Sequence, residues 1–175
     1  MLDLSDPAHP RALADPITFD GAALAVRWDR TGTRVVATSE EKSVEVADVS
    51  DPLHPRTVAT MAGPAGQLYS AGFSPDGRRV IAGGSNSEVW VWDLDGDSAS
   101  AGLVLRSFPG RVWDVRFVSD NHILVSGQQG LIRSWDVEPR AVLDDECARP
   151  GDGITEEEWT VHVHGLDYSP PCGGR

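Results

Sequence analysis

The residues that come nearest to metal-ligand spacing lie in one acidic stretch. Asp93, Asp95 and Asp97 alternate in the manner of the first ligands of a calcium loop. However, Gly96 comes too early for such a loop, and Val104 stands where the bidentate glutamate is required. The three aspartates therefore indicate a hairpin turn, and we expect no calcium site there.

Histidines and cysteines in the last 30 residues likewise lack the spacing of a zinc site. His162 and His164 form a His-x-His pair, whereas Cys147 and Cys172 stand singly, and structural zinc sites draw on closely paired ligands. The chain also has no nucleophile elbow, phosphate-binding glycine loop or Cys/His signature of a thiol enzyme. We therefore predict no catalytic, cofactor-binding or metal residues, and a protein that is not an enzyme.

The charge balance of the chain argues against a nucleic-acid partner. Fifteen Lys and Arg stand against 27 Asp and Glu, a formal net charge of -12, which repels a phosphate backbone unless a basic patch is present. No stretch approaches the roughly 18 consecutive apolar residues of a membrane span, and the first residues lack the basic leader of a secretion signal. We expect a cytoplasmic protein, or an extracytoplasmic one if an upstream part carries a membrane anchor. Lys42 is the sole lysine, which favours a GC-rich bacterial genome.

A seven-residue segment occurs twice and sets a period for the chain. Residues 5–11 recur as residues 50–56, identical at six of seven positions and displaced by 45 residues. His9 and His54 are therefore equivalent turn residues and not a pair of ligands. A fixed period of this length is typical of a repeat architecture.

Two further markers share this period. An aspartate that closes an apolar strand recurs in steps of 45, 45 and 43 residues, and a tryptophan precedes it in the last two copies. An aromatic residue that ends another apolar strand recurs in steps of 45 and 44 residues. The first set comprises Asp3, Asp48, Asp93 and Asp136 with Trp92 and Trp135, and the second comprises Trp28, Phe73 and Phe117.

Each period is divided into short strands by turns. In the second copy, apolar residues 68–73 precede the turn Ser-Pro-Asp-Gly, and alternating residues 88–92 precede a second acidic turn. Four such strands fit into each period, and no helix of useful length does. A four-stranded sheet that repeats in this way is the blade of a β-propeller, because each sheet buries its faces against its neighbours.

These features resemble the WD-repeat family over residues 1–140. The resemblance implies an all-β propeller of four-stranded blades, with an outer half-blade at residues 1–14 and complete blades at 15–62, 63–108 and 109–144. Three complete blades and half of another make an incomplete ring, since propellers close with about four to eight. We expect that missing N-terminal blades or self-association would close it.

Trp113 and Asp114 imitate the Trp-Asp closure out of phase. They precede Phe117 and are equivalent to positions on the first strand of each blade, where Leu24 and Tyr69 stand in the other copies. We therefore predict that Trp113 packs in the core.

The repeat stops before residues 145–175, which we expect to form a tail with a short helix packed on the propeller. Thr155 and Glu158 have the spacing of a capping box. A disulfide between Cys147 and Cys172 would close the tail into a loop. The arrangement is similar to the C-terminal segment of actinobacterial WD-repeat proteins.

The resemblance implies a non-enzymatic scaffold that binds other proteins, as the C-terminal part of a larger regulatory or signalling protein. Two alternatives remain from the sequence. The chain is a fragment of a ligand-binding or hydrolase-like and lactonase-like propeller enzyme, or it is a truncated, non-functional remnant.

Overall fold

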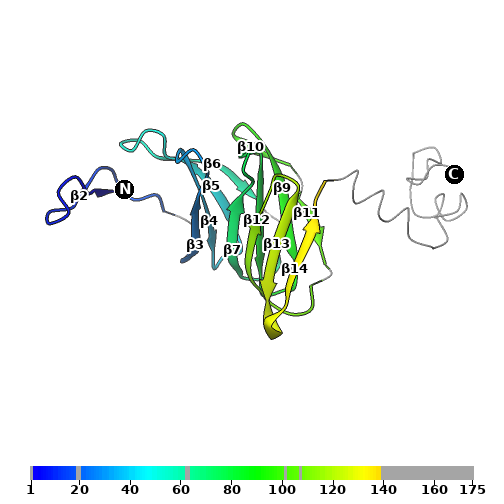
Figure 1. Cartoon of the computed structure of the whole chain (residues 1–175). Helices are drawn as coiled ribbons and strands as arrows, with labels where there is room; N and C mark the ends of the chain where they lie inside the picture. Colours follow the sequence, from blue (N-terminus) through cyan, green and yellow to red (C-terminus); the bar gives the residue numbers. More distant parts are fainter. Residues whose placement is uncertain (1, 19–20, 62–63, 101, 107, 139–175) are drawn as a thin grey trace, which may run out of the picture. The chain divides into compact units, whose positions relative to one another are not determined.

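The computed structural model describes residues 2–18, 21–61, 64–100, 102–106 and 108–138 (Figure 1). The chain forms two compact units, Met1–Trp135 and Asp136–Arg175, and the sheets described below belong almost wholly to the first. The predicted C-terminal helix and both cysteines lie outside the described residues.

The first four-stranded sheet is antiparallel, with its strands in chain order. It consists of β3 (Ala23–Trp28), β4 (Arg34–Ser39), β5 (Val44–Asp48) and β6 (Arg56–Met61). Valine and threonine occur throughout these strands and suit a pleated, half-buried surface. Gly32, at a φ of 71°, occupies the left-handed region in the turn between β3 and β4.

The next two sheets begin with the same antiparallel arrangement of three strands in chain order. The second sheet comprises β7 (Leu68–Phe73), β8 (Arg79–Gly84) and β9 (Val89–Asp95), with β10 (Ser98–Ala99) and β11 (Leu103–Leu105) both pairing with β9. The third comprises β12 (Val112–Phe117), β13 (His122–Gly127) and β14 (Ile132–Asp136), with a 3-10 turn at Gln128–Gly130. A separate pair joins β1 (Leu2–Asp3) to β2 (Arg11–Ala12).

This architecture confirms the predicted all-β fold of WD-type blades. The described residues form four antiparallel sheets, and these sheets do not close into a ring. The innermost strands β3, β7 and β12 lie in succession, because β7 contacts both of the others.

Adjacent blades are held together by an apolar layer between them. Val36, Val44 and Val46 of the first blade pack with residues of the second, including Val80 and Trp92, and all are almost fully buried. Burying a side chain of this kind stabilises the fold by about 1.5–3 kcal/mol relative to leaving it exposed.

Apolar positions that are buried between blades are open at the two ends of the row. Val26 on β3 is 47% exposed, whereas the equivalent Ala71 and Val115 are 2% and 1% exposed. At the other end, Leu124 and Ile132 are exposed. Within the part of the chain that the structure describes, the blade faces at both ends therefore have exposed apolar side chains.

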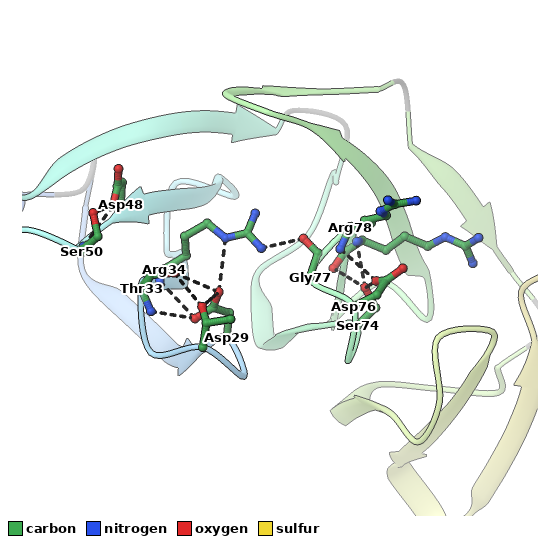
Figure 2. A network of polar contacts seen from close by, with 11 residues as sticks. Asp29, Thr33, Arg34, Asp48, Ser50, Ser74, Asp76, Gly77 and Arg78 are labelled. Atoms are coloured by element: carbon green, nitrogen blue, oxygen red, sulfur yellow. Dashed lines mark hydrogen bonds and ion pairs between the residues drawn. The ribbon is translucent and has the colours of Figure 1, made fainter.

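An arginine links each of the first two blades to the next. Arg34 donates from Nη2 to the carbonyl oxygen of Gly77 at 2.7 Å (Figure 2), and its guanidinium lies 5.2 Å from the centre of the Phe73 ring. Arg79, 45 residues later, donates to the carbonyl oxygen of Asp120 in the third blade at 3.4 Å. The period of the sequence thus repeats a contact between blades.

Asp29 fixes the position of Arg34. Its carboxylate accepts hydrogen bonds from the backbone NH groups of Thr33 and Arg34 at 3.0 and 3.1 Å, and from the Arg34 side chain at 3.3 Å (Figure 2). Burial alone would raise the pKa of Asp29, but these bonds and one from Thr31 outweigh it and lower that pKa.

Candidate protein-binding surface

The innermost strand of each of the three larger sheets carries an irregularity at the same repeat position. The pairing of β3 with β4 skips Leu24, that of β7 with β8 skips Tyr69, and that of β12 with β13 skips Trp113. A residue outside the ladder in this way belongs to a β-bulge, which turns its side chain away from the regular alternation. We call the surface formed by these three residues and the strand segments that follow them the inner-strand surface.

Two of the bulge residues form an aromatic pair on the inner-strand surface. The rings of Tyr69 and Trp113 stack with centroids 5.3 Å apart and an interplanar angle of 24°. Trp113 is 48% exposed, so the prediction that it packs in the core is wrong. The bulge explains the difference, because it removes Trp113 from the alternation that the period implies.

A polar contact between blades supports the aromatic pair. Ser70 is buried, and its hydroxyl donates to Oδ1 of Asp114 at 2.6 Å and accepts from the backbone NH of Val115 at 3.4 Å. Arg116 donates from Nε to the other carboxylate oxygen of Asp114 at 3.0 Å. Since Ser70 and Asp114 directly follow Tyr69 and Trp113, these bonds fix the backbone beside both rings.

The surroundings of Asp114 stabilise its ionised carboxylate. Burial alone would raise the pKa of Asp114, but the hydrogen bond from Ser70, the ion pair with Arg116 and the positive charge of Arg27 together lower it. Asp114 is therefore a carboxylate at neutral pH.

A small cleft lies beside this network on the same strands. Its volume is about 120 Å³, and residues 27–28, 71–73 and 115–117 line it. Arg27, Gly72 and Arg116 stand at equivalent repeat positions in the three blades. The middle strand, β7, therefore has a glycine without a side chain at the position where the strands on either side have an arginine.

The predicted repeat residues have local contacts. Trp92 is buried and stacks on Trp90 at 5.7 Å, and Trp135 lies 6.1 Å from Phe108. Asp93 pairs with Arg79 at 3.1 Å.

The other repeat aspartates hold the backbone immediately after a strand. Asp3 and Asp48 each accept the backbone NH of the serine two residues later, at 2.9 and 3.0 Å. Asp136 accepts the backbone NH of Glu138 at 2.8 Å. These contacts give the repeat aspartates a role in shaping turns.

The repeated histidines also have matching local partners. Nδ1 of His9 lies 2.8 Å from Asp6, and Nδ1 of His54 lies 2.8 Å from Asp51. Each pair closes the same turn of the duplicated segment, and the hydrogen bond with His54 lowers the pKa of Asp51.

The described part of the chain holds no group of three or more His, Cys, Asp or Glu side chains that could bind a metal ion. Asp97, from the acidic stretch, pairs with Arg56 at 3.0 Å. A broad hollow of about 630 Å³ lies between residues 14–18 and 53–57. Arg56 on its wall pairs with Asp48 at 3.2 Å.

The antiparallel sheets, their shared period and their stacked order define an array of WD-type propeller blades. A family model described as WD domain, G-beta repeat matches residues 55–93 and 102–136, and both matches end at a Trp-Asp closure. These matches support a WD-repeat family for the chain. No curated protein matches it. Among the described residues, no helix has the length and apolarity needed to cross a membrane.

Sequence reasoning missed Arg27, Ser70 and Arg116, although a signal for them was present. Arg27 and Arg116 each precede the aromatic residue that marks the period, and Gly72 precedes it in the middle copy. Comparing the copies column by column would have placed the two arginines on either side of a glycine.

Proposed function

We propose that this chain is a non-enzymatic scaffold that binds another protein through its inner-strand surface. The observation that carries the proposal is the stacked pair of Tyr69 and Trp113, which is partly exposed. The hydrogen bond between Ser70 and Asp114, the residues that directly follow the two rings in sequence, supports this pair. Protein interfaces are enriched in tyrosine and tryptophan, which often dominate the binding energy. WD repeats generally serve as protein-interaction modules, and the family match supports the same function.

We propose also that the blades work inside a larger regulatory or signalling assembly in the bacterial cytoplasm. Val26 and Ile132 are exposed at the two ends of the row, whereas the equivalent residues of the other blades are buried. A further blade, supplied by the same polypeptide or by a second copy, would cover them. The almost lysine-free composition supports the bacterial part of this proposal.

Differential capture tests the binding surface. The full chain and the double variant Tyr69→Ala, Trp113→Ala are immobilised, and the proteins retained from a cell extract are compared by quantitative mass spectrometry. Leu53→Ala is the matched control, because Leu53 is exposed on the turn between β5 and β6. We expect a protein that the wild type and the control retain and the double variant loses. Identical retention by all three would refute the proposed surface.

Two further measurements test the rest of the proposal. Light scattering gives the molar mass of the chain, and a stable monomer that resists limited proteolysis would contradict the need for a covering blade. Turnover of esters or lactones, with or without added metal, would contradict the non-enzymatic function.

A further inference from the structure

The cleft beside Asp114 has the composition of an anion site. Arg27 comes from β3 and Arg116 from β12, and β7 runs between these strands. Gly72, on β7, adds no side chain between them, and a Cβ placed there would meet only the carbonyl oxygen of Val115, at 3.9 Å. The cleft exists because the middle repeat has glycine where its neighbours have arginine.

Arg27 keeps most of its hydrogen-bonding capacity. Among the described residues, its side chain donates to the carbonyl oxygen of Val26 at 2.9 Å and forms no ion pair within 4 Å. A guanidinium has five N–H donors in a planar fork that matches a carboxylate. Several of these donors therefore remain for a ligand.

The charge of the cleft selects among anions. Two guanidiniums, Arg27 and Arg116, act on the single carboxylate of Asp114, which leaves one net positive charge. One negative charge would balance it, whereas a phosphate dianion would leave an excess beside Asp114. The volume of about 120 Å³ corresponds to roughly four water molecules in the liquid, which is room for a carboxylate.

We propose that this cleft binds a side-chain carboxylate of an acidic segment in the partner protein. The inference rests on the proposed function, since it names the chemistry of the partner at the same surface. The aromatic pair lies next to the cleft along β7 and β12 and would pack against the apolar part of that segment. The net charge of -12 on the whole chain repels acidic proteins at long range, but salt limits that repulsion to about 8 Å at physiological ionic strength.

The probes for the test are two capped hexapeptides that differ only in charge. One alternates glutamate with glycine, and the other has glutamine in place of each glutamate. Each is titrated into the full chain while the Nε–Hε signals of Arg27 and Arg116 are followed by NMR. Inorganic phosphate is titrated separately. We expect saturable shifts of both arginine signals with the glutamate peptide and none with the glutamine peptide.

Variants place the binding in the cleft. Arg27→Gln and Arg116→Gln should each lower the affinity for the glutamate peptide about tenfold, which is the loss expected when a charge-assisted hydrogen bond is removed. Gly72→Leu should block the cleft while leaving both arginines in place. Arg30→Gln is the control, because Arg30 is exposed in the turn after β3 and does not line the cleft. Circular dichroism establishes whether each variant is folded. If Gly72→Leu does not fold, the two arginine variants test the inference without it.

Three outcomes would overturn the inference: equal shifts with both peptides, unchanged affinity in the folded arginine variants, or tighter binding of phosphate than of the glutamate peptide. The proposed function fails separately. If Tyr69→Ala, Trp113→Ala still loses a captured protein while the peptide titrations fail, the surface binds a partner of different chemistry and only the carboxylate inference is wrong.

Discussion

Two valines at equivalent repeat positions offer a direct test of how the blades are stabilised. Val115 is 1% exposed between the second and third blades, and Val26 is 47% exposed on the open face of the first. We expect Val115→Ala to destabilise the chain strongly and Val26→Ala to do so weakly. The same substitution on the same strand position makes each variant the control for the other.

The expected magnitudes follow from burial. Replacing a buried valine by alanine removes two methyl groups, each of which stabilises the fold by about 0.8 kcal/mol when buried. The substitution also leaves a cavity, which destabilises the fold further. We therefore expect Val115→Ala to lower the free energy of unfolding by about 2–3 kcal/mol. Because Val26 is about half exposed, Val26→Ala loses only about half of this burial contribution and leaves no enclosed cavity. We therefore expect Val26→Ala to lower the free energy of unfolding by about 0.8 kcal/mol. The lower strand preference of alanine affects both variants alike.

Urea denaturation followed by tryptophan fluorescence, at low micromolar protein, measures both values. Equal losses in the two variants would refute the reasoning, because Val26 would then be covered in solution. If a second copy covers it, the cost of Val26→Ala rises with protein concentration, and repeating the measurement at higher concentration detects this.

Three other predictions concern the polar and aromatic contacts. Arg34→Met removes the hydrogen bond to Gly77 and should lower the free energy of unfolding by about 1–2 kcal/mol, whereas Arg30→Met should have little effect in the same urea assay. The pKa of Asp29 is lower in the folded protein than its ordinary value of 3.8. The Asp29 carboxylate therefore stabilises the fold fully when the pH is above that ordinary pKa, and this stabilisation is lost as the pH falls through the lowered pKa of the folded state. Asp29→Asn should therefore be less stable at neutral pH and decline less steeply below pH 3.8, and parallel pH curves would contradict this. A double-mutant cycle on Tyr69 and Trp113 should give a coupling of about 0.5–1.5 kcal/mol, and a coupling near zero would show that the stacked pair does not persist in solution.

The fold was largely predictable because its signals are local and repeated. The turn at residues 74–77, the alternation before Asp93 and the duplicated segment each specify backbone structure within a few residues. The exposure of Trp113 was not predictable in this way, because a bulge changes the side-chain alternation without changing the period.

The site depended on contacts between blades, which no single repeat contains. Ser70 and Asp114 are 44 residues apart and meet only when β7 and β12 lie together. The cleft requires the absence of a side chain at Gly72 as much as the presence of Arg27 and Arg116. A search for clusters of functional residues along the chain does not detect such an absence.

The three bulges allow the side chains of the inner-strand surface to change without a change in the fold. Leucine, tyrosine and tryptophan occupy equivalent bulge positions at Leu24, Tyr69 and Trp113, so three side chains of different size are compatible with one backbone geometry. A mutation at such a position replaces a partly exposed side chain and leaves the strand ladder intact. Each blade can therefore acquire a new exposed residue independently of the others, and the proposed binding surface can evolve one repeat at a time.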